Sequence, residues 1–178
     1  MNVRNNFSTF ALLGTLIFIA GCGGLKVPDD LPKLHPAQIE ITSDEGKKLE
    51  GAIVSLFLVG GGGEAVGAAT DNKGIATLYT RDLFVGAPAG KYKVCVNWSI
   101  GVEMTPPPEG TPQRERYDEA LKRPGYEPRI TQYPALEPEF QDAKNTPLEV
   151  EIVEGKNNFS LTVKLSEMGK QLAAEHGK

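Results

Sequence analysis

The sequence predicts an all-β fold, a seven-stranded β-sandwich, and three observations indicate it. Short segments in which apolar and polar residues alternate recur along the chain, and a period of two is typical of strands with one face on a core. Turn-forming Gly, Asn, Asp and Pro separate these segments. Helical signals appear in a proline-rich insertion and weakly near the C-terminus, so the alternating helices of an α/β protein are not predicted.

The clearest predicted strand is residues 91–98, where alternation is strict over eight positions. Tyr92, Val94, Val96 and Trp98 share the face expected to point inward, and Cys95 lies on the other face. Ahead of it, residues 70–74 (Thr-Asp-Asn-Lys-Gly) predict a turn, since Asn and Gly tolerate positive φ and the Asp side chain caps its own turn.

Six further segments complete the predicted sandwich. They are residues 37–42, 51–59, 65–70, 75–80, 148–153 and 158–165. The run 51–59 is almost continuously apolar, which favours a central strand covered on both faces. Glycines 60–63 lack the Gly-Lys-Ser/Thr ending of a phosphate-binding loop, so a hairpin is the better interpretation. We expect the last two segments to form a closing hairpin, with Phe159, Leu161, Val163 and Leu165 inward.

A proline-rich insertion, residues 99–147, interrupts this pattern and holds nine of the thirteen prolines. Residues 111–122 predict a short helix, with Thr111 as N-cap, Pro112 in the first turn and Pro124 beyond the end. Two interpretations stay open. We prefer that the insertion packs over one sheet, anchored by scattered aromatic residues; the alternative is a functional loop.

The N-terminus, residues 1–21, predicts a secretory signal, with Arg4 followed by an apolar run from Phe10 to Ala20. Ile19, Ala20, Gly21 and Cys22 then follow in order. This tetrad resembles the lipobox of bacterial lipoproteins, and the resemblance implies cleavage before Cys22 and acylation of its thiol, as with palmitate. Gly23 rather than Asp at the next position implies the outer membrane. An ordinary secreted protein with a chance cysteine is the alternative.

The mature chain would have 157 residues (178 − 21), a length that suits one domain. With Arg4 removed it carries 18 basic and 23 acidic side chains, a net charge of about −5, which provides no basic footprint for nucleic acid. We expect residues 22–36 to be a tether, residues 37–165 the sandwich, and residues 166–178 a polar, fraying tail of one or two helical turns.

Three motifs carry a family resemblance. They are residues 51–54 (Gly-Ala-Ile-Val), 70–74 (Thr-Asp-Asn-Lys-Gly) and 88–94 (Pro-Ala-Gly-Lys-Tyr-Lys-Val). Together they resemble the carboxypeptidase regulatory-like, transthyretin-like domain, and residues 130–133, 146–148 and 155–159 resemble its closing half in small bacterial envelope lipoproteins. The resemblance implies a Greek-key sandwich of the transthyretin (prealbumin) type. Residues 60–63 and 99–129 depart from the pattern, so no shared partner is carried over.

No residue set predicts catalysis. Both histidines, His35 and His176, fall in the expected tether and tail, so His-based metal sites and Ser-His-Asp or Cys-His sets are not predicted. Cys95 is expected to be a buried, inert thiol beneath the insertion. Glu149 and Glu151 share one outward strand face, unlike acids across a glycosidase cleft. We therefore expect no metal and no cofactor.

The sequence thus predicts a non-catalytic, lipid-anchored binding or structural module of the bacterial cell envelope. Its partner would be another envelope protein or a glycan, and its candidate surface is the insertion with Tyr117, Tyr126 and Tyr133, because aromatic residues are enriched where surfaces bind. Two alternatives are an envelope hydrolase with an unrecognised acidic site and an accessory subunit of an envelope assembly or transport system.

Overall fold

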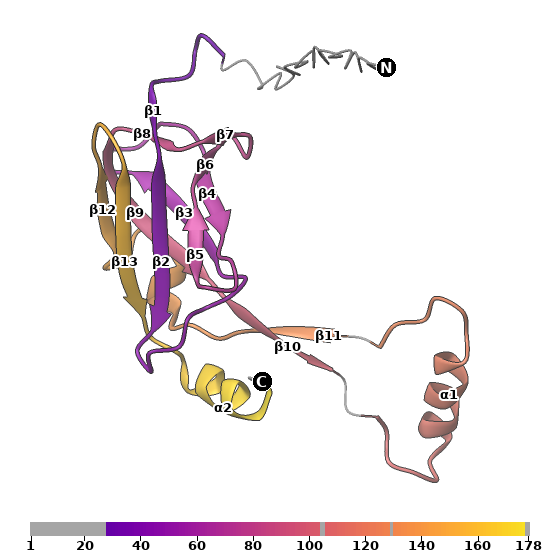
Figure 1. Ribbon diagram of the computed structural model, residues 1–178. Helices are drawn as coiled ribbons and strands as arrows, with labels where there is room; N and C mark the ends of the chain where they lie inside the picture. The colour runs from indigo at the N-terminus through magenta and orange to yellow at the C-terminus, as the bar shows by residue number, and fades with distance from the viewer. Residues whose placement is uncertain (1–27, 104–105, 129, 177–178) are drawn as a thin grey trace, which may run out of the picture.

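The computed structural model describes residues 28–103, 106–128 and 130–176. Within them it contains thirteen strands, two α-helices and one 3-10 helix (Figure 1). The strands are β1 (Leu34–His35), β2 (Ala37–Ser43), β3 (Ile53–Leu58), β4 (Val66–Ala69), β5 (Ile75–Thr77), β6 (Tyr79–Thr80), β7 (Phe84–Val85), β8 (Ala87–Pro88), β9 (Gly90–Asn97), β10 (Ser99–Glu103), β11 (Ile130–Pro134), β12 (Glu149–Ile152) and β13 (Asn157–Val163). The helices are α1 (Pro112–Leu121), η1 (Pro138–Gln141) and α2 (Glu167–His176).

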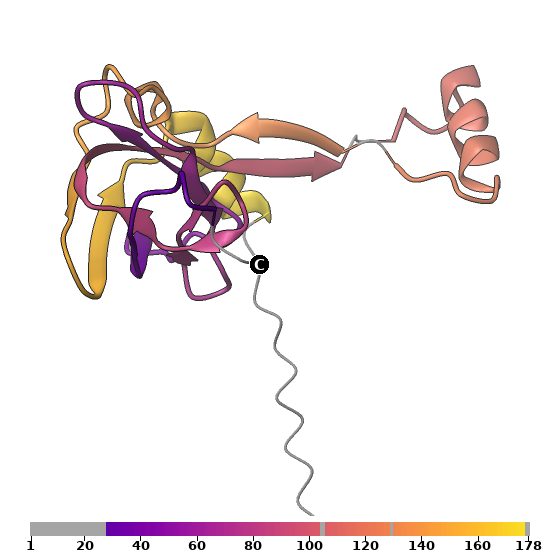
Figure 2. The same cartoon turned by 90° about the horizontal axis from the view of Figure 1, so that it is seen from above.

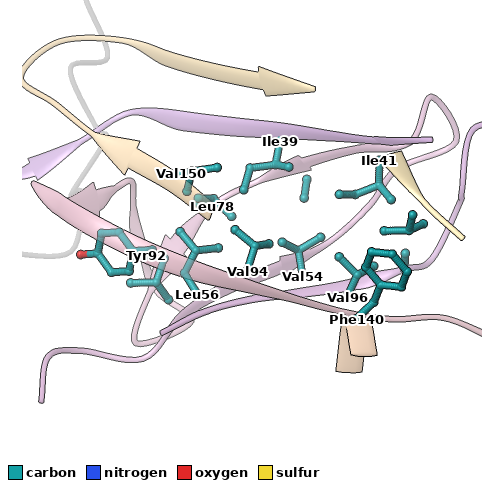
Figure 3. Close-up of a cluster of buried hydrophobic side chains, with 14 of the residues drawn as sticks. Ile39, Ile41, Val54, Leu56, Leu78, Tyr92, Val94, Val96, Phe140 and Val150 are labelled. Atoms are coloured by element: carbon teal, nitrogen blue, oxygen red, sulfur yellow. The ribbon is translucent and has the colours of Figure 1, made fainter. Parts of the chain in front are cut away.

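Two sheets enclose the core, which confirms the predicted mostly-β, sandwich-like fold. The larger has the order β12-β9-β3-β4-β6-β7 and the smaller the order β13-β2-β5. Ile39 and Ile41 of β2 meet Val54 of β3 and Val94 and Val96 of β9 between them, all fully buried (Figure 3). The alternation in β2 and β9 produces this arrangement, because every second side chain enters the same interior.

Each of the seven predicted segments contains strand, and one of them changes sheets. Within residues 75–80, β5 pairs with β2 in the smaller sheet, whereas β6 pairs with β4 in the larger. Leu78, between them, is fully buried; its N–H donates to the Ala37 carbonyl and its carbonyl accepts from Gly86. Five short strands were not predicted, namely β1, β7, β8, β10 and β11.

The predicted closing hairpin is wrong. β12 pairs with β9 in the larger sheet, while β13 runs parallel to β2 in the smaller one. The turn between them therefore crosses from one sheet to the other. The Asn157 side chain holds the crossing, since its amide nitrogen donates to the Val153 and Gly155 carbonyls and its oxygen accepts from the Val153 N–H. Both strands bury alternate side chains, so alternation alone did not reveal their partners.

β3 is central, as predicted, but it is covered on one face only. Val54 and Leu56 enter the core, whereas Ile53 and Phe57 are each 49% exposed on the outer face. The far end of the long insertion after β9 extends away from the sandwich (Figure 2). It therefore does not cover the outer face of β3. The apolar run predicts burial on both faces of this strand, whereas the structure exposes one of the two faces to solvent.

The predicted tether is also wrong for its described part. β1 pairs with β8, and Leu31 and His35 are buried. The His35 Nδ1 accepts from the Gly155 N–H at 3.3 Å. The histidine placed outside the domain by sequence therefore lies inside it, and the folded part begins well before residue 37.

The C-terminal segment is a ten-residue helix rather than one or two turns. Ser166 caps α2 by accepting from the Gly169 N–H at 3.0 Å. Gly169 itself is pressed against the backbone, because a Cβ built there would lie 2.0 Å from the Ala135 carbonyl oxygen. Close contact through a glycine, rather than a wide apolar face, docks α2 beside β10 (Figure 1).

The predicted turn at residues 70–74 is confirmed. The Asp71 carboxylate accepts from the Lys73 and Ile75 N–H groups at 2.8 and 2.9 Å, and Gly74 has φ of 74°. The buried Thr70 hydroxyl accepts from the Ala52 N–H and donates to the Leu49 carbonyl. These motif residues therefore build the sandwich, and their hydrogen bonds account for their spacing.

Candidate binding surface

An arm, defined here as residues 99–134, leaves the sandwich at the end of β9. β10 and β11 pair antiparallel over five residues, from Ser99 opposite Pro134 to Glu103 opposite Ile130. α1 lies at the far end of this ribbon, away from both sheets (Figure 1, Figure 2). The preferred prediction, that the insertion packs over a sheet, is therefore wrong for this part. It holds for residues 135–147, where Ala135, Leu136 and Phe140 are buried.

The helix at the tip forms for the local reasons that the sequence indicated. Thr111 is the N-cap: its hydroxyl accepts from the Arg114 N–H at 3.2 Å and donates to the Pro108 carbonyl. The Arg114 guanidinium pairs with Asp118 one turn on, at 2.9 Å. None of the α1 residues is buried. The cap, the proline and one ion pair hold a helix that has no core of its own.

The base of the arm, by contrast, is tied to the sandwich. The Ala135 N–H donates to the Trp98 carbonyl at 2.9 Å, and the Trp98 indole donates to the Glu50 carbonyl at 2.9 Å. The Ser166 N–H donates to the Ala135 carbonyl, which brings α2 to the same place. The ribbon is therefore oriented where it leaves the fold.

The three predicted contact residues do not form one cluster. Tyr117 is half-buried on α1 and Tyr126 is exposed just after it, so both lie near the tip. Tyr133 is exposed on β11 opposite Ile100, near the base. Sequence reasoning missed two exposed apolar side chains of the arm, Leu121 and Ile130. The signal was available, because both are large aliphatic residues in a segment rich in charge and proline.

A second apolar surface, also missed, is an open groove on the outer face of β3 and β4. Ile53 and Phe57 form one wall, and Gly67 and Ala69 provide a floor of small residues. Gly67 is required there, since an added Cβ would lie 2.7 Å from the Val54 carbonyl oxygen. The groove follows from the incomplete burial of β3.

Cys95 is buried, as predicted. It lies on the face of β9 that points away from the core between the two sheets, and η1 packs against β9. Burial, and secondarily the Asp142 carboxylate, raises the pKa of the thiol. A thiol kept protonated and enclosed is a poor nucleophile.

The carboxyl groups whose pKa is shifted lie in surface ion pairs or cap a turn. Lys93 holds Glu149 at 2.7 Å and lowers the pKa of that carboxyl, and Arg81 does the same for Glu64. Backbone N–H groups lower the pKa of Asp71. A general acid needs the opposite shift, toward neutral pH. Among the described residues there is also no group of three side chains placed to hold a metal ion.

The predicted lipidation residue Cys22, the tetrad positions Ile19, Ala20 and Gly21, and the signal segment 1–21 lie outside the residues that the structure describes. Within the described ranges, neither helix is long and apolar enough to cross a membrane.

No protein-family model matches the chain, and no curated protein matches it. Among solved structures, the major pilin subunit of Bacillus cereus has 15% identity over 74% of this chain, with a TM-score of 0.41. A 9R-lipoxygenase from Cyanothece PCC8801 has 14% identity over 73% of this chain, with a TM-score of 0.35. This chain covers 30% and 16% of their lengths. Both TM-scores are below 0.5, and neither protein indicates what this chain does.

Fold and surface together define a mostly-β chain with an arm that is hydrogen-bonded to the sandwich at its base and exposed at its tip.

Proposed function

We propose that this chain is a non-catalytic, lipid-anchored module of the bacterial cell envelope whose arm binds another envelope protein, with a glycan as the alternative ligand. One observation carries the proposal: the arm has structure but no core. A two-stranded ribbon is marginal by itself, and a helix with no buried residue gains little from packing. A partner that buries Leu121, Tyr126 and Ile130 would provide the missing apolar contact.

The lipid anchor is supported by the apolar N-terminal run and the tetrad that ends in Cys22. Two acyl chains hold a protein durably on a bilayer, since each buried methylene contributes about 0.8 kcal/mol. β1 lies at one end of the sandwich, and the arm leaves the sandwich nearer to the other end and extends sideways from it (Figure 1, Figure 2). An anchor at Cys22 would therefore leave the base of the arm at the end of the sandwich that is farther from the bilayer. Gly23 favours the outer membrane by analogy with other lipoproteins.

The finer fold assignment is part of the same proposal. In this proposal the seven strands β2, β3, β4, β5, β9, β12 and β13 would be the seven of a transthyretin-like Greek key. The resembling motifs serve as turns and strand ends, as the Thr70 and Asp71 hydrogen bonds illustrate. Such a domain would be a scaffold, and the arm would be the feature particular to this chain.

The non-catalytic assignment is supported by the state of the reactive groups. The Cys95 thiol has a raised pKa. Wherever the pKa of a described carboxyl group departs from its ordinary value, it is lowered. A screen of the purified chain against ester, peptide, phosphate and glycoside substrates should give no turnover. Reproducible turnover that survives repurification would contradict this part of the proposal and favour the hydrolase alternative.

The decisive experiment removes the tip and keeps the ribbon. Residues 104–129 are replaced by Asn-Gly, which suits a two-residue turn between the paired positions Glu103 and Ile130. Crosslinking and affinity capture from envelopes should recover a partner with the wild-type chain and lose it with this variant. Recovery of the same partner by both chains would sink the proposal.

Point variants sharpen the result. The double substitution Leu121→Ser and Tyr126→Ser should weaken binding by roughly tenfold or more, as loss of apolar anchors does. Glu115→Ser, on the same helix and also exposed, is the matched control and should bind as wild type. Protease treatment of the envelope before capture separates the ligands, since a glycan survives it and a protein does not.

A further inference from the structure

The segment before β2 is fixed to the domain at several points. Leu31 is buried and β1 pairs with β8. Arg81 joins this segment to the β6–β7 turn, with Nη2 3.0 Å from Asp30 Oδ2, and grips Glu64 through two further bonds of 2.6 and 2.7 Å. Lys33 pairs with Glu154 in the β12–β13 turn.

This docking shortens the free linker. If residues 23–36 were all free, the distance from Cys22 to the sandwich could reach about 50 Å at full extension. With the segment fixed from Pro28 onward, six residue steps separate Cys22 from the described fold, a reach of about 20 Å. An anchored domain would therefore stay close to the bilayer, with the end that carries β1 nearest to it.

That end of the sandwich is apolar at its loops. The N-terminal pole, as we call it, presents four large aliphatic side chains, each more than half exposed, on loops and on the edge strand around the docked segment. They are Val59 (53%), Leu83 (59%), Val85 (55%) and Val153 (52%). Leu83 and Val85 belong to the β6–β7 hairpin, and with Leu31 and Leu34 they line an open hollow.

The charges of the pole are largely paired with each other. Arg81 is held by Glu64 and Asp30, and Lys33 by Glu154. The other ionisable groups of these loops, Asp29, Asp82 and Lys156, add no excess of positive charge. A surface of this kind fits an apolar boundary better than an anionic one.

We propose that the N-terminal pole rests on the bilayer that holds the anchor, with Leu83 and Val85 inserted into the boundary between headgroups and acyl chains. The inference rests on the lipid anchor proposed above. Insertion would fix the orientation of the sandwich, so that the arm is held away from the membrane instead of swinging on a linker. The partner is the lipid surface itself, and zwitterionic lipid suffices.

Tryptophan placed at the pole tests this directly. The chain from Cys22 onward is coupled through that thiol to a maleimide lipid in phosphatidylcholine vesicles, which supplies the anchor chemically. Leu83→Trp is compared with Leu121→Trp, an exposed leucine at the arm tip, with the native Trp98 as common background. Brominated acyl chains should quench the added emission of Leu83→Trp at least about twofold more than that of Leu121→Trp, since interfacial side chains lie within reach of the acyl boundary.

Equal quenching of the two variants would overturn the proposal. The double substitution Leu83→Ser and Val85→Ser provides a second readout, because it should increase the rotational freedom of the anchored chain, measured by fluorescence anisotropy, without changing its unfolding midpoint. Unchanged anisotropy would count against insertion. Lipidation is examined separately, by the mass of the wild-type and Cys22→Ser chains from envelopes, so an unacylated Cys22 would refute the anchor and leave the vesicle result standing on its own.

Discussion

In the sandwich, leucine and isoleucine side chains are enclosed between two sheets, whereas in the arm the same residue types meet solvent. Leu78 is fully buried and Leu121 is largely exposed; Ile41 is fully buried and Ile130 is exposed. Both regions nevertheless form regular structure. The sandwich is held by non-local burial, while the arm is held by local devices: a cap, a ribbon register and an ion pair. The difference identifies the arm as a unit whose ordered structure is lost at little cost in free energy, and the partner proposed above would stabilise it.

The largest expected contrast comes from a matched pair of leucines. Leu78→Ala should lower the free energy of unfolding by about 2–5 kcal/mol, because it leaves a cavity in the core. Leu121→Ala should change it by less than about 0.5 kcal/mol, as exposed substitutions do. Urea unfolding of the two variants measures both values. Similar losses would show that the arm is part of the cooperative core.

The junction between the two regions depends on Gly169. Gly169→Ala should destabilise the chain by about 1–3 kcal/mol, because the added methyl group would collide with the Ala135 carbonyl oxygen. This loss is the net value after the gain of about 1 kcal/mol that alanine brings to a helix, because the added methyl group collides with backbone. Limited proteolysis should then release α2 and cut the base of the arm sooner. A stabilised variant would mean that helix propensity outweighs the contact.

The sequence predicted the parts of each region that depend on local chemistry. The turn at Asp71, the Thr111 cap of α1 and the inward faces of β2 and β9 all follow from residue type and spacing. The pairing of the strands with one another did not follow from residue type and spacing. Strands β12 and β13 alternate equally well, so their crossing between sheets required knowledge of the whole interior.

The missed surfaces share one cause. An apolar run in a strand predicts burial, although the burial of each residue depends on what lies across from it. Ile53 and Phe57 of β3, and Leu83 and Val85 at the N-terminal pole, are exposed because no described segment covers them. Conversely, residues 28–36 have the proline-rich composition of a free linker, yet Leu31 and His35 are buried there. Composition alone does not distinguish these cases.

Within the arm, a smaller effect should appear without any change in the sandwich. Thr111→Ala removes the side-chain acceptor of the Arg114 N–H and should destabilise α1 by about 1 kcal/mol. Hydrogen exchange of the α1 amides should accelerate while exchange in β2 and β9 stays unchanged. Thr131→Ala, an exposed threonine of β11, is the control. Accelerated exchange in β9 as well would show that arm and sandwich unfold together.

The smallest effect concerns acid sensitivity, and it belongs to the sandwich. Two backbone N–H groups lower the pKa of Asp71 below its ordinary value of 3.8, so this carboxylate stabilises the fold above that pH, and the contribution disappears as the pH falls through the lower folded value. Asp71→Asn keeps an acceptor oxygen for the same two groups but does not titrate. The unfolding midpoint of this variant should therefore decline less steeply below about pH 4 than that of wild type. Glu119→Gln, on the exposed surface of α1, removes the same charge outside the turn and is the control for the loss of one negative charge. Parallel curves for wild type and Asp71→Asn would show that the turn gains nothing from the charge of this carboxylate.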